Sequence, residues 1–540
     1  MGLALGRSRA AVWPLAVAWI LYALSVTGIA CACRRLNDGH MVYALDDTYI
    51  HMTIARNLAV SGTYGVCPGE FNSASSSPGW TFLLAGVTRV FGASDWPPLL
   101  LNVLFALAAL AVAYRVGGLA AASPRRRMAL LLAILLLTPM IPVTFAGMEH
   151  MLHLFAVLLL ACFLMSILAV EGPAPAGAVL GLCLAAAVAV AARYESLFFV
   201  AAAAGVLVFR RRWGVVLPLV LSAAVPAVMM GAFSMAHGQG FLPNSVLLKG
   251  SMPSLHTAKD MGKALGGEAL LQLPQIPSLY ALLVCAVLLL AWRLRKNRRT
   301  EAADLLLIAA VATMLLHVQF ARTGWFYRYE AYLVALMVTA LFLAIPETLD
   351  LRSAGSVLAA GAVLAVLLLP PIVRGAKALW ETPRATQNIY QQQYQTGLFL
   401  RNFYRDAPVA VNDIGAVNYL ADIRCVDLAG LGTYEVARAR QRGEFSTDAI
   451  RRLVRDRGVK VAVLYASLFR DGSALPAEWI PVGSWEIRQN VVCGDRTVTF
   501  FATEPSEAPR LLRNLLEFRG RLPGSVTWKA RWSLPGEIGR

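Results

Sequence analysis

The sequence predicts an α-helical polytopic membrane protein that carries a small α/β domain in its C-terminal part. The first observation behind this prediction is composition: 58% of the 540 residues are apolar and 15% are charged, whereas about 25% of a soluble chain is charged. The second is a change of pattern after residue 373, where long apolar runs give way to short ones. Together they exclude an ordinary cytosolic enzyme, a disordered chain and a fibrous protein.

Apolar stretches account for most of the first 373 residues. A run of about 17 apolar residues or more can cross the bilayer as a helix. The first stretch follows Arg7 and Arg9, as a signal peptide would, but its length favours a membrane anchor. We therefore expect about eleven spans, near residues 11–31, 97–119, 128–143, 151–170, 177–192, 197–209, 214–236, 276–292, 304–321, 331–349 and 354–373.

The formal net charge of +17 is better explained by membrane orientation than by nucleic acid, which we do not expect as a partner. With a cytoplasmic N-terminus, all the dense basic clusters fall on the cytoplasmic side, as the positive-inside rule requires. The same orientation places the loops 32–96 and 237–275, and everything after residue 373, outside the cytoplasm. The basic clusters are Arg7 and Arg9, Arg125–Arg127, Arg210–Arg212, the set Arg293, Arg295, Lys296, Arg298 and Arg299, and Arg352.

The part after residue 373 has the pattern of a connecting helix followed by an α/β domain. The Gln- and aromatic-rich stretch within 374–406 predicts an amphipathic helix on or near the bilayer surface. The sequence shows no internal repeat, so an inverted-repeat transporter gains no support. Residues 407–540 predict the α/β domain, with strands at 408–413, 424–430 and 459–466 and helices at 415–422 and 447–458.

The first outer loop, 32–96, contains a concentration of polar residues. Asp46 and Asp47 open a helical stretch, where a carboxylate can cap free backbone N–H groups. One aspartate would satisfy that structural role, so the second indicates a site. His51 follows Asp47 by four residues and lies on the same helical face. The apolar stretch 80–91 predicts a short helix that re-enters the bilayer.

Three further groups of polar residues interrupt the outer ends of apolar spans. Each group alone could be a structural ion pair or an interfacial anchor. Their common placement on the face that carries the aspartates instead predicts one site, which binds an anionic headgroup and performs acid–base chemistry. In it, Arg193, Arg322 and Arg328 could hold phosphate oxygens. The three groups are Glu149 with His150, Arg193 with Glu195, and Arg322 with Arg328, Tyr329 and Glu330.

At these residues the sequence resembles the GT-C superfamily of polytopic glycosyltransferases, which use polyprenyl-phosphate-linked sugars on the extracytoplasmic side. The motifs DDTYIH, SSSPGW and GMEH, with the segment 411–431, are similar to those of a bacterial branch. That branch includes mycobacterial terminal arabinofuranosyltransferases and dolichyl-phosphate-mannose-transferase-like proteins. The resemblance implies a catalytic domain at 1–373 in a bacterial inner membrane, with its active site and C-terminal domain extracytoplasmic.

The resemblance also implies roles for three acids. Asp46 matches the first acid of the family's pair and is expected to be the general base, with Asp47 beside it to orient the acceptor or a metal ion. Glu149 matches an acid that the family often brings into the same pocket. Some members use a divalent metal ion, for which these three carboxylates are oxygen ligands of a suitable kind. The sequence leaves the need for a metal open.

We therefore expect a glycosyltransferase that moves a sugar from a polyprenyl-phosphate donor to a hydroxyl of a glycan, lipid or protein acceptor. Inversion is expected, because one base acting on one incoming hydroxyl permits a single displacement. The alternatives are a lipid-linked sugar flippase or other transporter, and a binding module on a membrane anchor. A disulfide between Cys425 and Cys493 is a further hypothesis, since both lie in the outer α/β domain.

Overall fold

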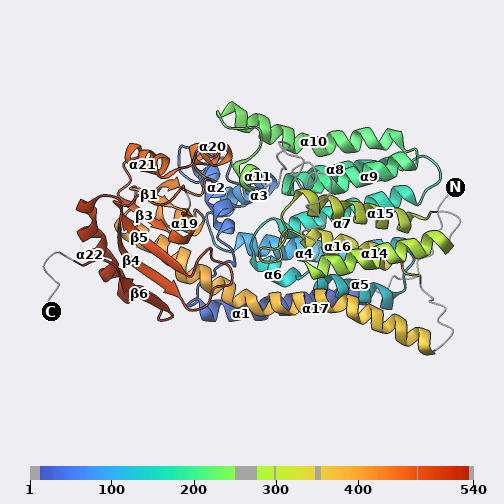
Figure 1. Ribbon diagram of the computed structural model, residues 1–540. Helices are drawn as coiled ribbons and strands as arrows, with labels where there is room; N and C mark the ends of the chain where they lie inside the picture. The colour runs from blue at the N-terminus through green and yellow to red at the C-terminus, as the bar shows by residue number, and fades with distance from the viewer. Residues whose placement is uncertain (1–11, 250–275, 297–299, 347–353, 471, 534–540) are drawn as a thin grey trace.

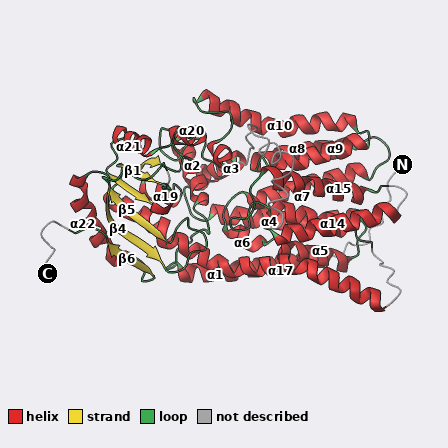
Figure 2. Ribbon diagram, viewed as in Figure 1, coloured by secondary structure: helices red, strands yellow, loops and turns green. Residues whose placement is uncertain are grey.

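The protein consists of a helical bundle and a C-terminal domain at opposite ends of an elongated molecule (Figure 1). The computed structural model describes residues 12–249, 276–296, 300–346, 354–470 and 472–533. Within these ranges the sheet lies in the C-terminal domain (Figure 2). The prediction of a helical membrane part joined to a separate α/β domain is confirmed.

Among the described residues, six helices are long and apolar enough to cross a membrane. Three further apolar helices, α8 (Ala176–Ala192), α9 (Ser196–Phe209) and α16 (Ala331–Ala344), are shorter, so the count of eleven spans stays a prediction. α7 is the central helix, since it is mostly buried and packs against α4, α8 and α16. The six long helices are α1 (Trp13–Leu36), α4 (Pro97–Leu119), α7 (His150–Leu168), α10 (Trp213–Ala236), α14 (Pro277–Lys296) and α15 (Ala302–Phe320).

One predicted span is broken in the structure. The stretch 128–143 forms α5 (Pro124–Leu137) and a separate short helix, α6 (Met140–Phe145). Pro139 lies between them, and it ends the first helix because proline has no backbone N–H to donate. The apolar character of the stretch alone predicts one continuous helix, whereas Pro139 accounts for the break.

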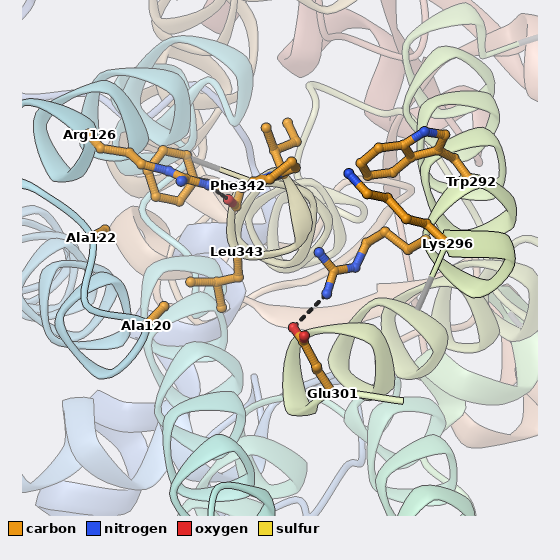
Figure 3. Close-up of a pocket in the computed structure, with 11 residues that line it drawn as sticks. Ala120, Ala122, Arg126, Trp292, Lys296, Glu301, Phe342 and Leu343 are labelled. Atoms are coloured by element: carbon orange, nitrogen blue, oxygen red, sulfur yellow. Dashed lines mark hydrogen bonds and ion pairs between the residues drawn. The ribbon is translucent and has the colours of Figure 1, made fainter. Parts of the chain in front are cut away.

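Arginine and lysine side chains from α5 and α14 line a pocket of the bundle (Figure 3). Arg126 and Arg293 donate hydrogen bonds to carbonyls at the C-terminal end of α16, Arg126 to Phe342 and Arg293 to Ala344, both at 2.8 Å. A cavity of about 330 Å³ lies between these side chains and Lys296. Residues of two basic runs thus lie together, and the orientation of the chain in the membrane stays a prediction. Arg7, Arg9, Arg298, Arg299 and Arg352 lie outside the described residues.

The C-terminal domain is built on a mixed sheet. Its strand order is β2-β1-β3-β5-β4-β6, in which β1 pairs in parallel with β2 and β3 and the other pairs are antiparallel. The strands and helices expected between 408 and 466 are confirmed, whereas β4 to β6, α20 and α22 were not predicted. The elements are β1 (Pro408–Val411), α19 (Ala416–Ala421), β2 (Arg424–Asp427), α20 (Tyr434–Arg442), α21 (Thr447–Asp456), β3 (Val461–Leu464), β4 (Ile480–Ile487), β5 (Thr497–Ala502), α22 (Ala508–Phe518) and β6 (Val526–Ala530).

The connecting segment differs from its prediction. α17 (Ala354–Ile389) runs on through a π-helical turn (Tyr390–Tyr394) into α18 (Gln395–Phe403). Phe399 is fully buried, and its ring packs against Trp485, Phe500 and Phe518 of the C-terminal domain. The apolar face around Phe399 is therefore covered by the sheet and α22, and this part of the segment belongs to the core of the domain.

Candidate active site

The start of α2 (Asp47–Ser61) packs tightly against the turn that precedes α7. The backbone N–H of Ala44 donates to the carbonyl of Phe145 at 2.9 Å. Gly147 in this turn has a φ of +68°, and a Cβ there would overlap the ring of Tyr43 and lie 2.6 Å from Cγ2 of Thr48. A glycine is therefore needed for the close approach that brings the first outer loop to the GMEH turn.

Asp47 belongs to a chain of contacts that crosses between the first loop and the segment before α16. Its Oδ2 accepts a hydrogen bond from Nη2 of Arg328 at 2.6 Å. The same nitrogen donates to the hydroxyl of Tyr329 at 2.9 Å, and the guanidinium lies 4.7 Å from the centre of that ring. The Tyr329 ring also contacts Arg193, whose guanidinium lies 5.3 Å from the ring centre. These residues and their partners form one polar cluster.

Glu149 and Arg193 form the buried centre of the cluster. Their Oε1 and Nη1 atoms are 2.6 Å apart, and Nε of Arg193 donates to Oε2 of Glu195 at 3.2 Å. Oε2 of Glu149 lies 3.6 Å from Nε2 of His51. The charge of Arg193 is therefore shared between two carboxylates, which leaves it less able to hold a phosphate than the sequence suggested.

Several polar atoms of the cluster are buried without a hydrogen-bond partner in the described structure. They include both ring nitrogens of His150, Oε2 of Glu149 and Nε of Arg328. Arg328 is 2% exposed and His150 1%. Buried polar groups of this kind are uncommon in folded proteins and call for an explanation such as a ligand or a catalytic role. Arg328 thus retains a donor that a bound anion can use.

Asp46, the neighbour of Asp47 in the chain, contacts the C-terminal domain. Its Oδ2 accepts the backbone N–H of Gly415 and its Oδ1 that of Ala416, each at 2.8 Å. Burial and the neighbouring Asp413 carboxyl raise the pKa of Asp46 above its usual range, although the two N–H groups oppose this shift. The segment 411–431 carries a family-like motif, but no feature of its residue types predicts contact with Asp46.

Two predicted residues lie at the margin of the cluster. Glu330 is buried, pairs with Arg374 and accepts the backbone N–H of Gly324 at 2.9 Å. Arg322 is exposed, and its guanidinium lies 3.4 Å from the carbonyl oxygen of Leu248. His150 lies 4.0 Å from Glu149, measured from Nε2 to Oε1. Side-chain contacts thus join all the other predicted site residues except Asp46, namely Asp47, His51, Glu149, His150, Arg193, Glu195, Arg328 and Tyr329.

The three carboxylates proposed as metal ligands do not fit a metal site in this arrangement. Asp46 is bound to backbone amides, Asp47 to Arg328 and Glu149 to Arg193. No group of three or more His, Cys, Asp or Glu side chains with metal-binding geometry occurs in the described ranges.

The cysteines are arranged differently from the expected pair. Sγ of Cys67, in the first outer loop, accepts the backbone N–H of Cys425 at 3.3 Å. Cys493 lies instead beside Gln393, with 3.6 Å between Sγ and Oε1. The thiol close to Cys425 is thus that of Cys67, which joins the outer loop to the edge of the sheet.

Comparisons with known proteins identify the fold. A family model described as a domain of unknown function (DUF8728) matches residues 387–501, and no curated protein matches the sequence. Two solved structures of ArnT from Cupriavidus metallidurans, bound to undecaprenyl phosphate and in the apo state, are similar at 14% identity. Their TM-scores are 0.53 and 0.52, and the matches cover 90% and 92% of this chain and 98% and 99% of theirs.

A third solved structure, of the arabinofuranosyltransferase AftD from Mycobacteria, is 15% identical, with a TM-score of 0.39. Its match covers 90% of this chain and 40% of that chain. The likeness to ArnT over nearly the whole length of both chains confirms the fold that the sequence predicted: this is a multi-pass membrane protein with the GT-C fold.

Proposed function

We propose that the protein is a membrane glycosyltransferase that uses a polyprenyl-phosphate-linked sugar and transfers it to an acceptor hydroxyl on the extracytoplasmic face of a bacterial inner membrane. The observation that carries this proposal is the buried polar cluster around Arg328 at the domain end of a GT-C bundle. ArnT, which shares the fold, binds undecaprenyl phosphate. An anionic lipid headgroup is the ligand that an arginine at the end of membrane helices suits.

The donor phosphate is assigned to Arg328. This side chain is held by Asp47 and Tyr329 and keeps Nε unpartnered. A guanidinium fixed in this way presents its remaining N–H donor in a set direction, which favours a hydrogen bond from Nε to a phosphate oxygen. Arg193 and Arg322 are weaker candidates, because the first is neutralised by two glutamates and the second is exposed.

Asp46 is proposed as the general base. Each of its oxygens accepts one N–H, and a carboxylate oxygen can accept two hydrogen bonds, so a position on each oxygen is left for the acceptor hydroxyl. In the reaction the hydroxyl oxygen forms a bond to the anomeric carbon and its proton passes to Asp46. The bond from the anomeric carbon to the phosphate oxygen breaks, and polyprenyl phosphate leaves with the electron pair. A single displacement of this kind inverts the anomeric centre.

The test is sugar transfer by the full chain in proteoliposomes, with a panel of labelled undecaprenyl-phosphate-linked pentoses and hexoses and a cell-envelope extract as acceptor. We expect a labelled acceptor product, and loss of at least about 100-fold in rate for Asp46→Asn. Glu70→Gln, in an exposed acid of the same loop, is the control and should keep its rate. If the labelled lipid-linked sugar moves to the other leaflet and no new glycosidic bond forms, the protein is a flippase instead.

A further inference from the structure

The first outer loop and the C-terminal domain meet along two short helices. α2 of the loop packs against α19 of the domain, and α19 lies within the residues that match the domain of unknown function. Polar contacts occur at both ends of this pair. One end holds Asp46 and the other holds Arg56, ten residues later, which is about 15 Å along a helix.

At the first end, a glycine lets the two backbones touch. A Cβ on Gly415 would overlap the carbonyl oxygen of Asp46 and lie 2.7 Å from its carboxyl carbon. The φ of Gly415 is −80°, a value open to other residues, so space and not backbone conformation requires glycine here. This close approach is what allows the N–H groups of Gly415 and Ala416 to reach the carboxylate at 2.8 Å.

At the second end, Arg56 fastens the far side of α19. Its Nη1 donates to the carbonyl of Tyr419 at 2.8 Å and its Nη2 to Oδ1 of Asp422 at 3.1 Å. Its guanidinium also lies 5.6 Å from the centre of the Tyr419 ring. Because one attachment lies at the start of α19 and the other at its end, together they fix the direction of α19 along α2 as well as its position.

We propose that the C-terminal domain acts as a positioning module for the catalytic carboxylate: the N–H groups of Gly415 and Ala416 orient Asp46, and Arg56 keeps α19 in place to do so. This inference rests on the proposed function, since it assigns the domain a role in the same reaction. Hydrogen bonds to a carboxylate favour its charged form and fix its lone pairs. Gly415, Ala416 and Arg56 are positioning residues and do not touch the substrate.

The first experiment compares Gly415→Ala with Gly520→Ala in the full chain. A Cβ at Gly520 meets open space, so that variant controls for the substitution itself. In Gly415→Ala the added carbon separates the two backbones and weakens both hydrogen bonds, which disfavours the charged carboxylate. We expect the midpoint of the acid limb in the pH profile of kcat to move to higher pH by about 1 unit. At pH values below this midpoint, kcat of Gly415→Ala should be about tenfold lower than that of the wild type.

A merely structural role would lower the amount of active protein without moving this pH midpoint. The titratable groups that face Asp46 are unchanged in both variants; they are Asp47, Asp413, Tyr465 and Cys493. If Gly415→Ala does not fold, Arg56→Gln takes its place. Its control is Arg405→Gln, because exposed Arg405 pairs with the same Asp422 at 3.6 Å.

The second experiment needs no substrate. Hydrogen exchange of the backbone amides of Gly415 and Ala416 is measured in the wild type and in Asp46→Ala, where we expect exchange at least about tenfold faster in the variant. Unchanged exchange contradicts the positioning role whatever the transfer assay gives. Absence of transfer by the wild type contradicts the proposed function, and an unmoved pH midpoint with active wild type contradicts the inference alone.

Discussion

Arg193 and Glu149 form an ion pair of 2.6 Å between Nη1 and Oε1, although they come from turns before two different helices. Glu149 is fully buried and Arg193 is 6% exposed. Because Arg193 also pairs with Glu195, the three side chains link the start of α7 to the turn between α8 and α9. Removing one member of such a group leaves an uncompensated charge in the interior.

Arg193→Gln is therefore expected to destabilise the protein by about 3 kcal/mol or more. The measurement is the temperature at which the purified protein loses its folded state in detergent. The double variant Arg193→Gln with Glu149→Gln should recover part of the loss, because it removes one of the stranded charges. Equal melting temperatures for the single variant and the wild type would show that the pair carries no stability.

Arg328→Lys tests the phosphate assignment. Lysine keeps the charge beside Asp47 but lacks the planar set of donors and the unpartnered Nε, so undecaprenyl phosphate should bind about tenfold more weakly. Arg322→Gln, in an exposed side chain, should bind it nearly as the wild type does. Binding can be measured by native mass spectrometry of the protein in nanodiscs, and equal affinities of Arg328→Lys and wild type would oppose the assignment.

Gly147→Ala and Gly238→Ala form a matched pair for the approach of α2 to α7. Both glycines have positive φ, +68° and +74°, but a Cβ meets the Tyr43 ring at the first and nothing at the second. Both variants carry a backbone strain of about 1 kcal/mol, and overlap adds about 1–3 kcal/mol at Gly147. The melting temperature of Gly147→Ala should accordingly fall further; equal losses would mean that the turn relaxes freely.

The pH dependence of transfer follows from the raised pKa of Asp46, which burial and Asp413 push above its usual value of about 4. A base acts only in its deprotonated form, so kcat should fall as pH decreases through this raised pKa. The acid limb is then expected well above pH 4 in the wild type. A rate that stays constant down to pH 4 would rule out Asp46 as the base.

Mild oxidation should join Cys67 to Cys425. Sγ of Cys67 lies 3.3 Å from the backbone nitrogen of Cys425, and the two thiols also interact, so Cys67 is the thiol placed to form a bridge with Cys425. Peptide mapping after treatment with copper phenanthroline would detect the linked pair, and Cys67→Ser would abolish it. A link between Cys425 and Cys493 instead would contradict the arrangement of loop and sheet.

Much of the site was predictable, because the positions of apolar runs and of basic loops can be read locally from a sequence. Counted from span to span, they assign each loop to one side of the membrane. They placed Asp47, Glu149 and Arg328 at one end of the bundle, and the structure brings these side chains together. The partners of Asp46 could not be predicted, since they lie about 370 residues away in the chain and contact it through backbone N–H groups. Backbone contacts leave no signature in residue type, apart from the glycine at position 415.

The same limit explains the misplaced connecting helix. Gln391 and Gln392 belong to the stretch for which the sequence predicts a helix on the bilayer surface. In the structure they are buried, and they donate hydrogen bonds to Ser525 and to the carbonyls of Asp495 and Arg496. An amphipathic pattern states that one face is covered and does not state by what. Here the C-terminal domain covers the apolar face of the helix.

The helical path from α17 through the π-helical turn to α18 also couples the bundle mechanically to the C-terminal domain. Phe399 fills the centre of the C-terminal domain, yet it belongs to a rod that starts at Ala354. A residue of this rod therefore completes the core of the domain, so a displacement of α17 along its axis would disturb the packing of the sheet against α22.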